Sequence, residues 1–273
     1  MTDATLAALE SLSIAERIVR VRTKIADSCA RAGRPAAAVT LIAVSKTHPA
    51  PPILEAVAAG VRHFGENRIE EAGKIAPVMA ETKTIPLTWH MIGHVQSRKA
   101  HEVMQYFPWI HSLDSVKLAE RYARFLTEPQ PQSLPVEAEG LAEGKVLTHS
   151  LNVLLEINIS GEASKDGFVA NRWQDNADQR AALWACVGQT VILRTSGLVL
   201  RGLMTIAPVT DDPEQVRPVF AGLRTLRDAL AVDFPEADWQ MLSMGMTDDY
   251  PVAIEEGATL IRVGRAIFGD RTV

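Results

Sequence analysis

The chain has 273 residues, of which 47% are hydrophobic and 22% are charged. This composition can bury a large core, and it excludes a disordered chain, a fibrous repeat and a small disulfide scaffold. The net charge of −5 excludes the broad basic surface that non-specific nucleic-acid binding requires, so no nucleic-acid partner is expected. An anionic ligand would have to be bound by a local pocket.

The chain shows no sign of export or membrane insertion. Residues 1–10 carry acids and no basic run, so no secretory signal is expected. No apolar stretch approaches the roughly 20 residues of a membrane span. Cys29 and Cys186 stand alone, which favours reduced, buried side chains over a disulfide. We therefore predict a cytoplasmic protein with no membrane partner.

The first predicted element is a helix over residues 13–32. Ser13 and Glu16 have the spacing of a capping box, and Gly33 with Pro35 supplies the end of the helix. Apolar residues recur along it at helical spacing and give it one apolar face. This pattern is typical of a surface helix packed on a core.

After this helix, short apolar runs rich in β-branched residues alternate with helical patterns. Eight such runs lie at residues 41–45, 63–67, 89–93, 109–113, 153–160, 200–206, 240–245 and 260–264. Repeated alternation of strand and helix predicts a parallel sheet, and eight units most naturally close into a (β/α)8 TIM barrel. We predict an α/β fold with one domain over residues 1–273.

Two segments depart from the regular alternation. Only nine residues follow Gly264, too few for a full eighth helix, so residues 1–34 are expected to cover that part of the barrel. Residues 127–150 hold three prolines and two glycines without a clear period, which indicates a flexible insertion.

Side chains alternate across a strand, so residues of equal parity share one face. The side chains predicted to point into the barrel are Ile42, Val44, Lys46, Gly65, Asn67, Met241, Ser243, Gly245, Leu260, Arg262 and Gly264. Several strands therefore end in polar or small residues on this face. Barrel proteins place their ligand sites at the carboxyl ends of the strands.

Lys46 is the strongest candidate for chemistry. A lysine after a strand is often a solvated surface charge, but parity directs Lys46 inward among aliphatic neighbours, where an amine becomes nucleophilic toward carbonyls. Ser243, Gly245 and Gly264 end strands seven and eight, where barrels frequently bind phosphate. A lysine beside a phosphate site indicates a phosphorylated carbonyl compound, and both pyridoxal 5′-phosphate (PLP) and a sugar phosphate fit.

Eight motifs in order along the chain resemble those of the pyridoxal phosphate homeostasis protein family. They are AVSKT (43–47), FGEN (64–67), WHMIG (89–93), QSRK (96–99), EINI (156–159), RGLM (201–204), LSMGM (242–246) and RVGRAIFG (262–269). The resemblance implies a barrel similar to the N-terminal domain of alanine racemase that carries PLP as a Schiff base.

By residue match, the resemblance implies that Lys46 forms the Schiff base and that Arg262 faces the pyridine nitrogen. It further implies that phosphate is held by the Ser243 hydroxyl and the amides around Gly245, Gly264 and Arg265, that Asn67 lines the polar edge of the ring, and that His90 and Met204 form pocket wall. Two positions depart from the family pattern. Many relatives have Thr or Ser in place of Arg265, and many have Pro in place of His94.

The resemblance implies a role in PLP homeostasis without established turnover. We predict apo-PLP-dependent enzymes as partners and a monomer or weak homodimer as the assembly. An arginine at the pyridine nitrogen leaves that nitrogen neutral, which weakens the electron sink that transamination chemistry needs. The alternatives are a small PLP-dependent racemase or lyase, for which Tyr250 is the one tyrosine near the rim, and a Schiff-base aldolase acting on a sugar phosphate. His90 and His94 lie on a strand and a loop, and no metal site is expected.

Overall fold

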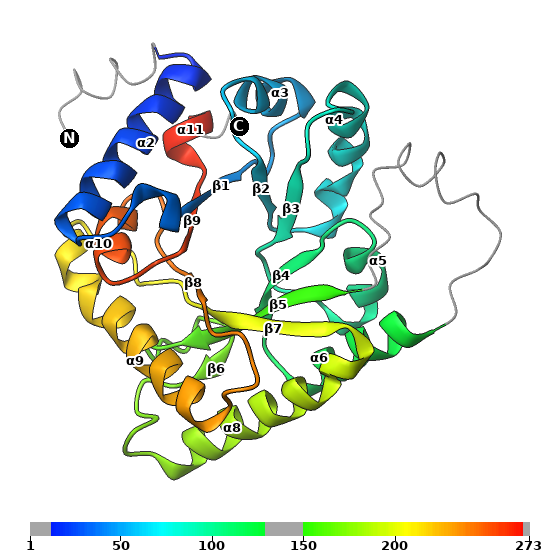
Figure 1. Ribbon diagram of the computed structural model, residues 1–273, viewed down its shortest axis with the longest axis vertical. Helices are drawn as coiled ribbons and strands as arrows, with labels where there is room; N and C mark the ends of the chain where they lie inside the picture. Colours follow the sequence, from blue (N-terminus) through cyan, green and yellow to red (C-terminus); the bar gives the residue numbers. More distant parts are fainter. Residues whose placement is uncertain (1–11, 129–149, 270–273) are drawn as a thin grey trace.

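The computed structural model describes residues 12–128 and 150–269. Nearly all of the predicted insertion at 127–150 lies outside the described residues. Eight parallel strands form a closed ring with the helices on its outside (Figure 1). Around the ring the order is β1, β2, β3, β4, β5, β7, β8 and β9, and β9 pairs with β1. The predicted (β/α)8 TIM barrel is therefore confirmed.

Each of the eight predicted strand segments overlaps one strand of the ring. The strands are β1 Thr40–Val44, β2 His63–Glu66, β3 Thr88–Met91, β4 Trp109–Leu113, β5 Leu151–Asn158, β7 Leu198–Met204, β8 Met241–Ser243 and β9 Leu260–Val263. The structure adds β6, Phe168–Val169, which pairs with the end of β5 outside the ring. Two residues show no detectable alternation, which is why the sequence did not indicate β6.

The helices follow the strands around the outside of the ring. They are α2 Ile14–Arg31, α3 Ala50–Ala58, α4 Ile75–Glu81, α5 Ala100–Met104, α6 Val116–Thr127, α8 Ala177–Ile192, α9 Arg217–Asp233, α10 Tyr250–Glu255 and α11 Arg265–Phe268. Short 3-10 turns are η1 Ala36–Ala38, η2 Ile69–Lys74, η3 Ser97–Lys99, η4 Leu193–Ser196 and η5 Pro213–Val216.

Helix α2 begins at the capping box that the sequence predicts. Ser13 accepts a hydrogen bond from the backbone of Glu16, and the Glu16 side chain accepts one from the backbone of Ser13. The helix packs against α10, α11 and α3, beside the short helix that follows β9 (Figure 1). Helix α11 has only four residues, so α2 covers a part of the barrel that α11 is too short to cover.

The barrel has an inner and an outer apolar layer, as the alternation of side chains requires. Ile42, Leu154, Met204 and Leu260 form a small cluster inside the ring. Ala43, Leu242 and Ile261, of the opposite parity, belong to the large core that also contains the helix side chains. The inner cluster lies among polar side chains of the barrel interior, which form the base of the site described below.

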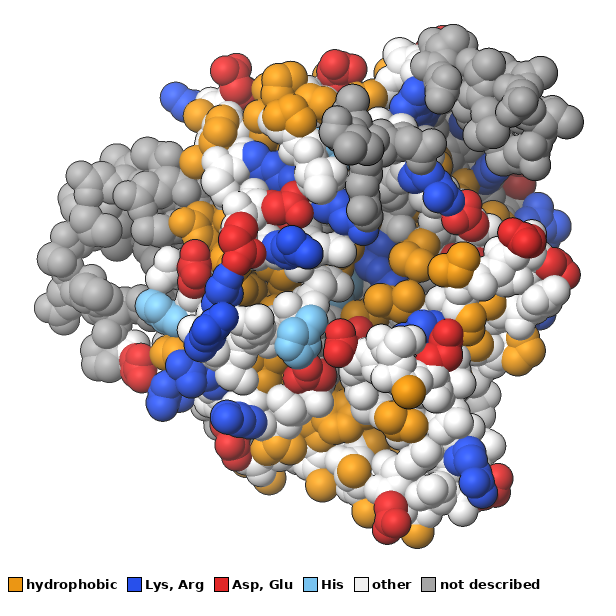
Figure 2. All heavy atoms as spheres, turned by 180° about the vertical axis from the view of Figure 1, so that it is seen from behind, with side chains coloured by type: hydrophobic (Ala, Val, Ile, Leu, Met, Phe, Trp, Pro, Cys, Tyr) orange, Lys and Arg blue, Asp and Glu red, His pale blue; other side chains and the backbone are white. Residues whose placement is uncertain are grey.

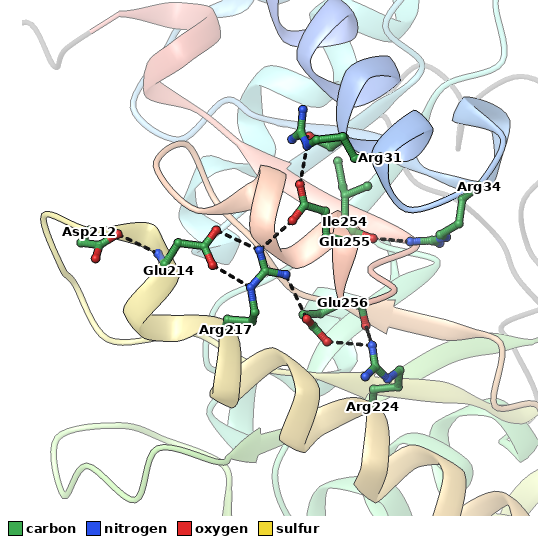
Figure 3. Close-up of polar contacts among 10 residues, drawn as sticks. Arg31, Arg34, Asp212, Glu214, Arg217, Arg224, Ile254, Glu255 and Glu256 are labelled. Atoms are coloured by element: carbon green, nitrogen blue, oxygen red, sulfur yellow. Dashed lines mark hydrogen bonds and ion pairs between the residues drawn. The ribbon is translucent and has the colours of Figure 1, made fainter.

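A network of ion pairs joins α2, α9 and α10 (Figure 3). The Arg217 guanidinium contacts Glu214 at 2.7 Å, Glu255 at 2.7 Å and Glu256 at 3.0 Å. Arg31 of α2 also contacts Glu255, at 2.7 Å. Networks of this kind stabilise more than isolated surface pairs do, because one ordered side chain serves several partners.

Arg217→Met is expected to lower the free energy of unfolding by about 1–2 kcal/mol, because it leaves three carboxylates without their shared cation. Urea denaturation measures the change, and high salt should reduce it. Arg124→Met, which removes an exposed pair with Glu128, is the matched control and should change stability by less than about 0.5 kcal/mol. Equal effects of the two substitutions would contradict a network.

The distribution of surface charge and the state of the two cysteines follow the expectations from the composition. Acidic and basic side chains are interspersed on the face shown in Figure 2, so neither sign dominates among the side chains coloured there. Among the described residues, no helix combines the length and the apolar character needed to cross a membrane. Cys29 and Cys186 are both free and buried, as predicted.

Candidate functional site

A cavity of about 570 Å³ lies at the carboxyl ends of the barrel strands. Its volume is in the range of small-molecule sites. The lining residues are Val44, Lys46, His48, Asn67, Ile92, Ile206, Met246, Thr247, Asp248, Arg262, Gly264, Arg265 and Gly269. Five of the seven site residues predicted from the sequence thus meet at one cavity, namely Lys46, Asn67, Arg262, Gly264 and Arg265.

The charges at the cavity favour an anion although the chain as a whole is acidic. Lys46, Arg262 and Arg265 line it, against one carboxylate, that of Asp248. Arg265 and Asp248 form an ion pair, and both are more than half exposed. Arg262 is only 4% exposed, so its charge acts in a poorly solvated environment, where it attracts an anion or a hydrogen-bond acceptor strongly.

The backbone that carries Lys46 has an uncommon conformation. Lys46 is the second residue after β1, and Thr47 follows it with a φ of 68°, in the left-handed region that residues other than glycine rarely adopt. The Thr47 amide donates a hydrogen bond to the Glu71 carboxylate at 2.6 Å. This contact holds the turn in place and fixes the point from which the Lys46 side chain extends.

Lys74 holds the same turn from behind. Its Nζ donates to the carbonyl oxygens of Ser45, at 2.7 Å, and His48, at 3.2 Å, which flank the turn. It also forms ion pairs with Glu66 at 3.0 Å and Glu71 at 2.9 Å. Burial raises the pKa of Glu66 to about 7, and the Lys74 charge opposes that rise. The Lys46 turn is therefore anchored by a buried polar cluster on the outer side of β1 and β2.

The end of β2 lies against the loop after β3. A Cβ added at Gly93 would lie 2.2 Å from the Asn67 carbonyl oxygen, so only glycine permits this approach. The close contact brings Asn67 and Ile92 to the same cavity.

The turn after β8 changes which residues reach the cavity. Gly245 has a φ of 92°, and a Cβ there would lie 2.6 Å from that of Ala253, so the turn depends on glycine. Met246, Thr247 and Asp248 line the cavity beyond this turn. Ser243 is fully buried beneath it, and neither Ser243 nor Gly245 is a lining residue.

Arg262 connects the cavity with the barrel interior. Its Nη1 donates to Ser243 Oγ at 2.7 Å and its Nη2 donates to the Thr205 carbonyl oxygen at 2.9 Å. Burial lowers the pKa of Arg262 to about 10, while the nearby Asp249 and Glu156 carboxylates oppose the change. The guanidinium therefore stays protonated near neutral pH and can only donate hydrogen bonds.

Several lining residues were not identified from the sequence. They are His48, Ile92, Ile206, Met246, Thr247, Asp248 and Gly269. Thr247 directly follows the LSMGM motif, and its hydroxyl was the signal in the sequence for a polar group at the cavity. Parity counting stops at the end of a strand, so it cannot follow the chain through the Gly245 turn.

The other residues considered in the sequence analysis lie elsewhere. His90 and Met204 are buried inside the barrel and do not line the cavity, and Tyr250 is 2% exposed at the start of α10. The His94 ring pairs with Asp114 at 3.0 Å. No cluster of metal-ligating side chains occurs among the described residues.

Glu156 is a buried carboxyl in the barrel, close enough to Arg262 for the two charges to interact. It is 7% exposed, and its Oε2 is buried without a hydrogen-bond partner among the described residues. Burial raises the pKa of Glu156 to about 7, and the Asp166 and Asp114 carboxylates add to the rise, while Arg262 opposes it.

The raised pKa of Glu156 predicts a loss of stability with rising pH. Because this pKa lies above its value of about 4.3 in the unfolded chain, the folded state binds more protons between these two values. Its stability contribution is fully present below the unfolded value and is lost as the pH rises through about 7, by about 4 kcal/mol in total. Glu156→Gln should remove this part of the pH dependence.

Urea denaturation at about pH 5 and about pH 8 measures this difference between Glu156→Gln and the native chain. Glu120→Gln, an exposed position on α6, is the matched control. Parallel pH dependence of Glu156→Gln and the native chain would show that Glu156 does not titrate in this range.

The protein is a (β/α)8 barrel protein with a basic cavity at the carboxyl ends of its strands. The family model for the alanine racemase N-terminal domain matches residues 21–272. The pyridoxal phosphate homeostasis protein of Pseudomonas aeruginosa is 41% identical over 260 residues, which cover 95% of this chain and 96% of the relative. The protein of that name from Escherichia coli K12 is 37% identical over 265 residues, 94% and 97% of the two chains.

Solved structures agree with these relatives. PipY of Synechococcus elongatus PCC7942, solved with PLP bound, superposes with a TM-score of 0.70 at 37% identity, over 94% of this chain and 100% of PipY. Alanine racemase of Clostridium difficile 630 superposes with a TM-score of 0.58 at 13% identity, over 93% of this chain and 57% of that chain, which shows a shared fold. The chain belongs to the pyridoxal phosphate homeostasis protein family, within the wider family of the alanine racemase N-terminal domain.

Proposed function

We propose that this protein binds PLP as a Schiff base on Lys46 and acts in PLP homeostasis. The observation that carries the proposal is the cavity itself, in which Lys46 on its anchored turn and the buried Arg262 line the same small space. In the binding step the Lys46 amine attacks the PLP aldehyde carbon, a C=N bond forms, and the carbonyl oxygen leaves as water. PLP bound to PipY, a relative 37% identical to this chain, supports the choice of ligand.

The residues around the cavity fit the parts of this ligand. Arg262 would donate to the pyridine nitrogen, and Asn67 would contact the polar edge of the ring. The backbone around Gly264 and Arg265 would bind the phosphate, and Thr247 lines the same cavity. Ser243, which lies below, would act on the ligand through Arg262, and Gly245 would act by shaping the Thr247 turn.

Storage and delivery fit this site better than catalysis. An arginine that stays protonated cannot hand a proton to the pyridine nitrogen, so the ring remains a weak electron sink. Tyr250, the tyrosine considered as the acid or base of a racemase, is buried and does not line the cavity. The matches cover nearly the whole length of relatives that are named as homeostasis proteins. We propose apo-PLP-dependent enzymes as the partners.

Titration of the purified protein with PLP tests the proposal. We expect a visible absorption band that saturates at one PLP per chain and that borohydride abolishes, with the reduced label in the peptide that contains Lys46. Exchange of the α-proton of alanine or serine in deuterated water tests the racemase alternative, and we expect none above the rate of free PLP. Cleavage of a ketose phosphate without a visible band would favour the aldolase.

Arg265→Thr is expected to change the affinity for PLP by less than about tenfold, because Arg265 is exposed and already paired with Asp248. Fluorescence or absorption titration measures the affinity. Asp248→Asn, which frees the same guanidinium, is the complementary variant. A loss of more than about a hundredfold in Arg265→Thr would instead make Arg265 a primary phosphate ligand.

A further inference from the structure

Three histidines lie inside the barrel below the cavity, on consecutive strands. His63 Nδ1 lies 3.0 Å from His90 Nε2, and His90 Nδ1 lies 3.0 Å from His111 Nε2. His111 Nδ1 lies 2.9 Å from Ser243 Oγ, which accepts from Arg262 Nη1 at 2.7 Å. All of these side chains except His63 are buried. A continuous chain of hydrogen bonds thus joins the partly exposed His63 to the arginine of the cavity.

The direction of each hydrogen bond in this chain follows from Arg262. A guanidinium only donates, so Ser243 Oγ accepts from Arg262. Among the described residues its other hydrogen-bond partner is His111 Nδ1, which is therefore the acceptor that remains for the one proton of Ser243. A neutral imidazole has one donor and one acceptor nitrogen, so His111 donates through Nε2 to His90, and His90 donates through Nε2 to His63.

The electrostatic environment keeps the chain neutral. Burial lowers the pKa of His90 and His111 well below the usual value, and the Arg262 charge lowers that of His111 further. Burial also lowers the pKa of His63. We therefore expect His63, His90 and His111 all to be neutral Nε2–H tautomers. Three imidazoles in a barrel interior cost desolvation energy, which only a fully hydrogen-bonded arrangement of this kind offsets.

We propose that this chain of hydrogen bonds positions Arg262 toward the ring nitrogen of the bound cofactor, with His111 and His90 as positioning residues; the inference rests on the proposed function. Two hydrogen bonds anchor the guanidinium, one to the fixed carbonyl of Thr205 and one to the hydroxyl of Ser243. A serine hydroxyl can rotate, and it keeps a lone pair toward Arg262 only while its proton is bound elsewhere. His111 binds that proton, and His90 holds His111 in the tautomer that can do so.

A pair of substitutions at His111 tests the inference. His111→Leu removes the acceptor for Ser243 and should weaken PLP binding about tenfold, the effect of losing one hydrogen bond. His111→Gln retains one acceptor and one donor, and its affinity should stay within about twofold of that of the native chain. His101→Leu, on the outer helix α5, is the control and should change nothing.

A second measurement does not need the cofactor. Nitrogen-15 NMR of the histidine rings in the ligand-free protein should show His63, His90 and His111 as Nε2–H tautomers, and His111→Leu should release His90 from this state. Failure of the native protein to bind PLP overturns the proposed function. The measured histidine tautomers still test the hydrogen bonds that join His63, His90, His111 and Ser243. The inference is overturned if His111→Leu binds PLP like the native chain, if Leu and Gln weaken binding equally, or if His111 carries its proton on Nδ1. If His111→Leu fails to fold, the tautomers of the native chain decide.

Discussion

Lys46→Ala is expected to lower the borohydride-trapped PLP to background and to abolish the visible absorption band. Of the lining residues, only Lys46 has an amine that can form an imine. The side chain is partly exposed at the rim, so its loss should change the free energy of unfolding by less than about 0.5 kcal/mol. Absorption spectra, peptide mapping after reduction and urea denaturation measure the three quantities.

Lys46→Arg separates the covalent from the electrostatic role of this lysine. It keeps the positive charge at the cavity but cannot form a stable imine under these conditions. We expect no trapped PLP but stronger residual, non-covalent binding than in Lys46→Ala. Trapping on a different lysine, or unchanged trapping in either variant, would refute the assignment of Lys46.

Lys74→Met is expected to lower the free energy of unfolding by about 3–5 kcal/mol, since it leaves the buried Glu66 carboxyl without its cation. It also removes the hydrogen bonds to the carbonyls of Ser45 and His48, so the turn that carries Lys46 should become mobile and PLP should bind more weakly. Denaturation and PLP titration measure the two effects.

The controls for Lys74 come from its surroundings. Lys99→Met, which removes the exposed pair with Glu70, should cost less than about 1 kcal/mol. Adding Glu66→Gln to Lys74→Met should restore part of the stability, because a neutral amide then replaces the buried carboxyl that has lost its cation. If the double variant is no more stable than the single one, the loss comes from the backbone contacts of Lys74 and not from the buried carboxyl.

Much of the barrel follows from local patterns in the sequence. Alternation along a strand depends only on the backbone of that strand, so the inward parity of Ile42 and Leu260, and the outward parity of Leu242, could be predicted without knowing the neighbours. Likewise, the capping box at Ser13 is a contact between residues three apart. The alternation of strand and helix, repeated eight times, then predicts a parallel barrel.

What the sequence by itself determined is which side chains point inward and which of them, above all Lys46 and Arg262, end their strands. Only the tertiary structure decided their height in the barrel, because height depends on the register between strands that are distant in sequence. Register shifts between β4 and β5 and between β5 and β7, and the positive φ of Gly245, alter that height locally. The tertiary structure places Ser243 beneath the cavity against His111, and the turn at Gly245 brings Thr247 to the cavity wall.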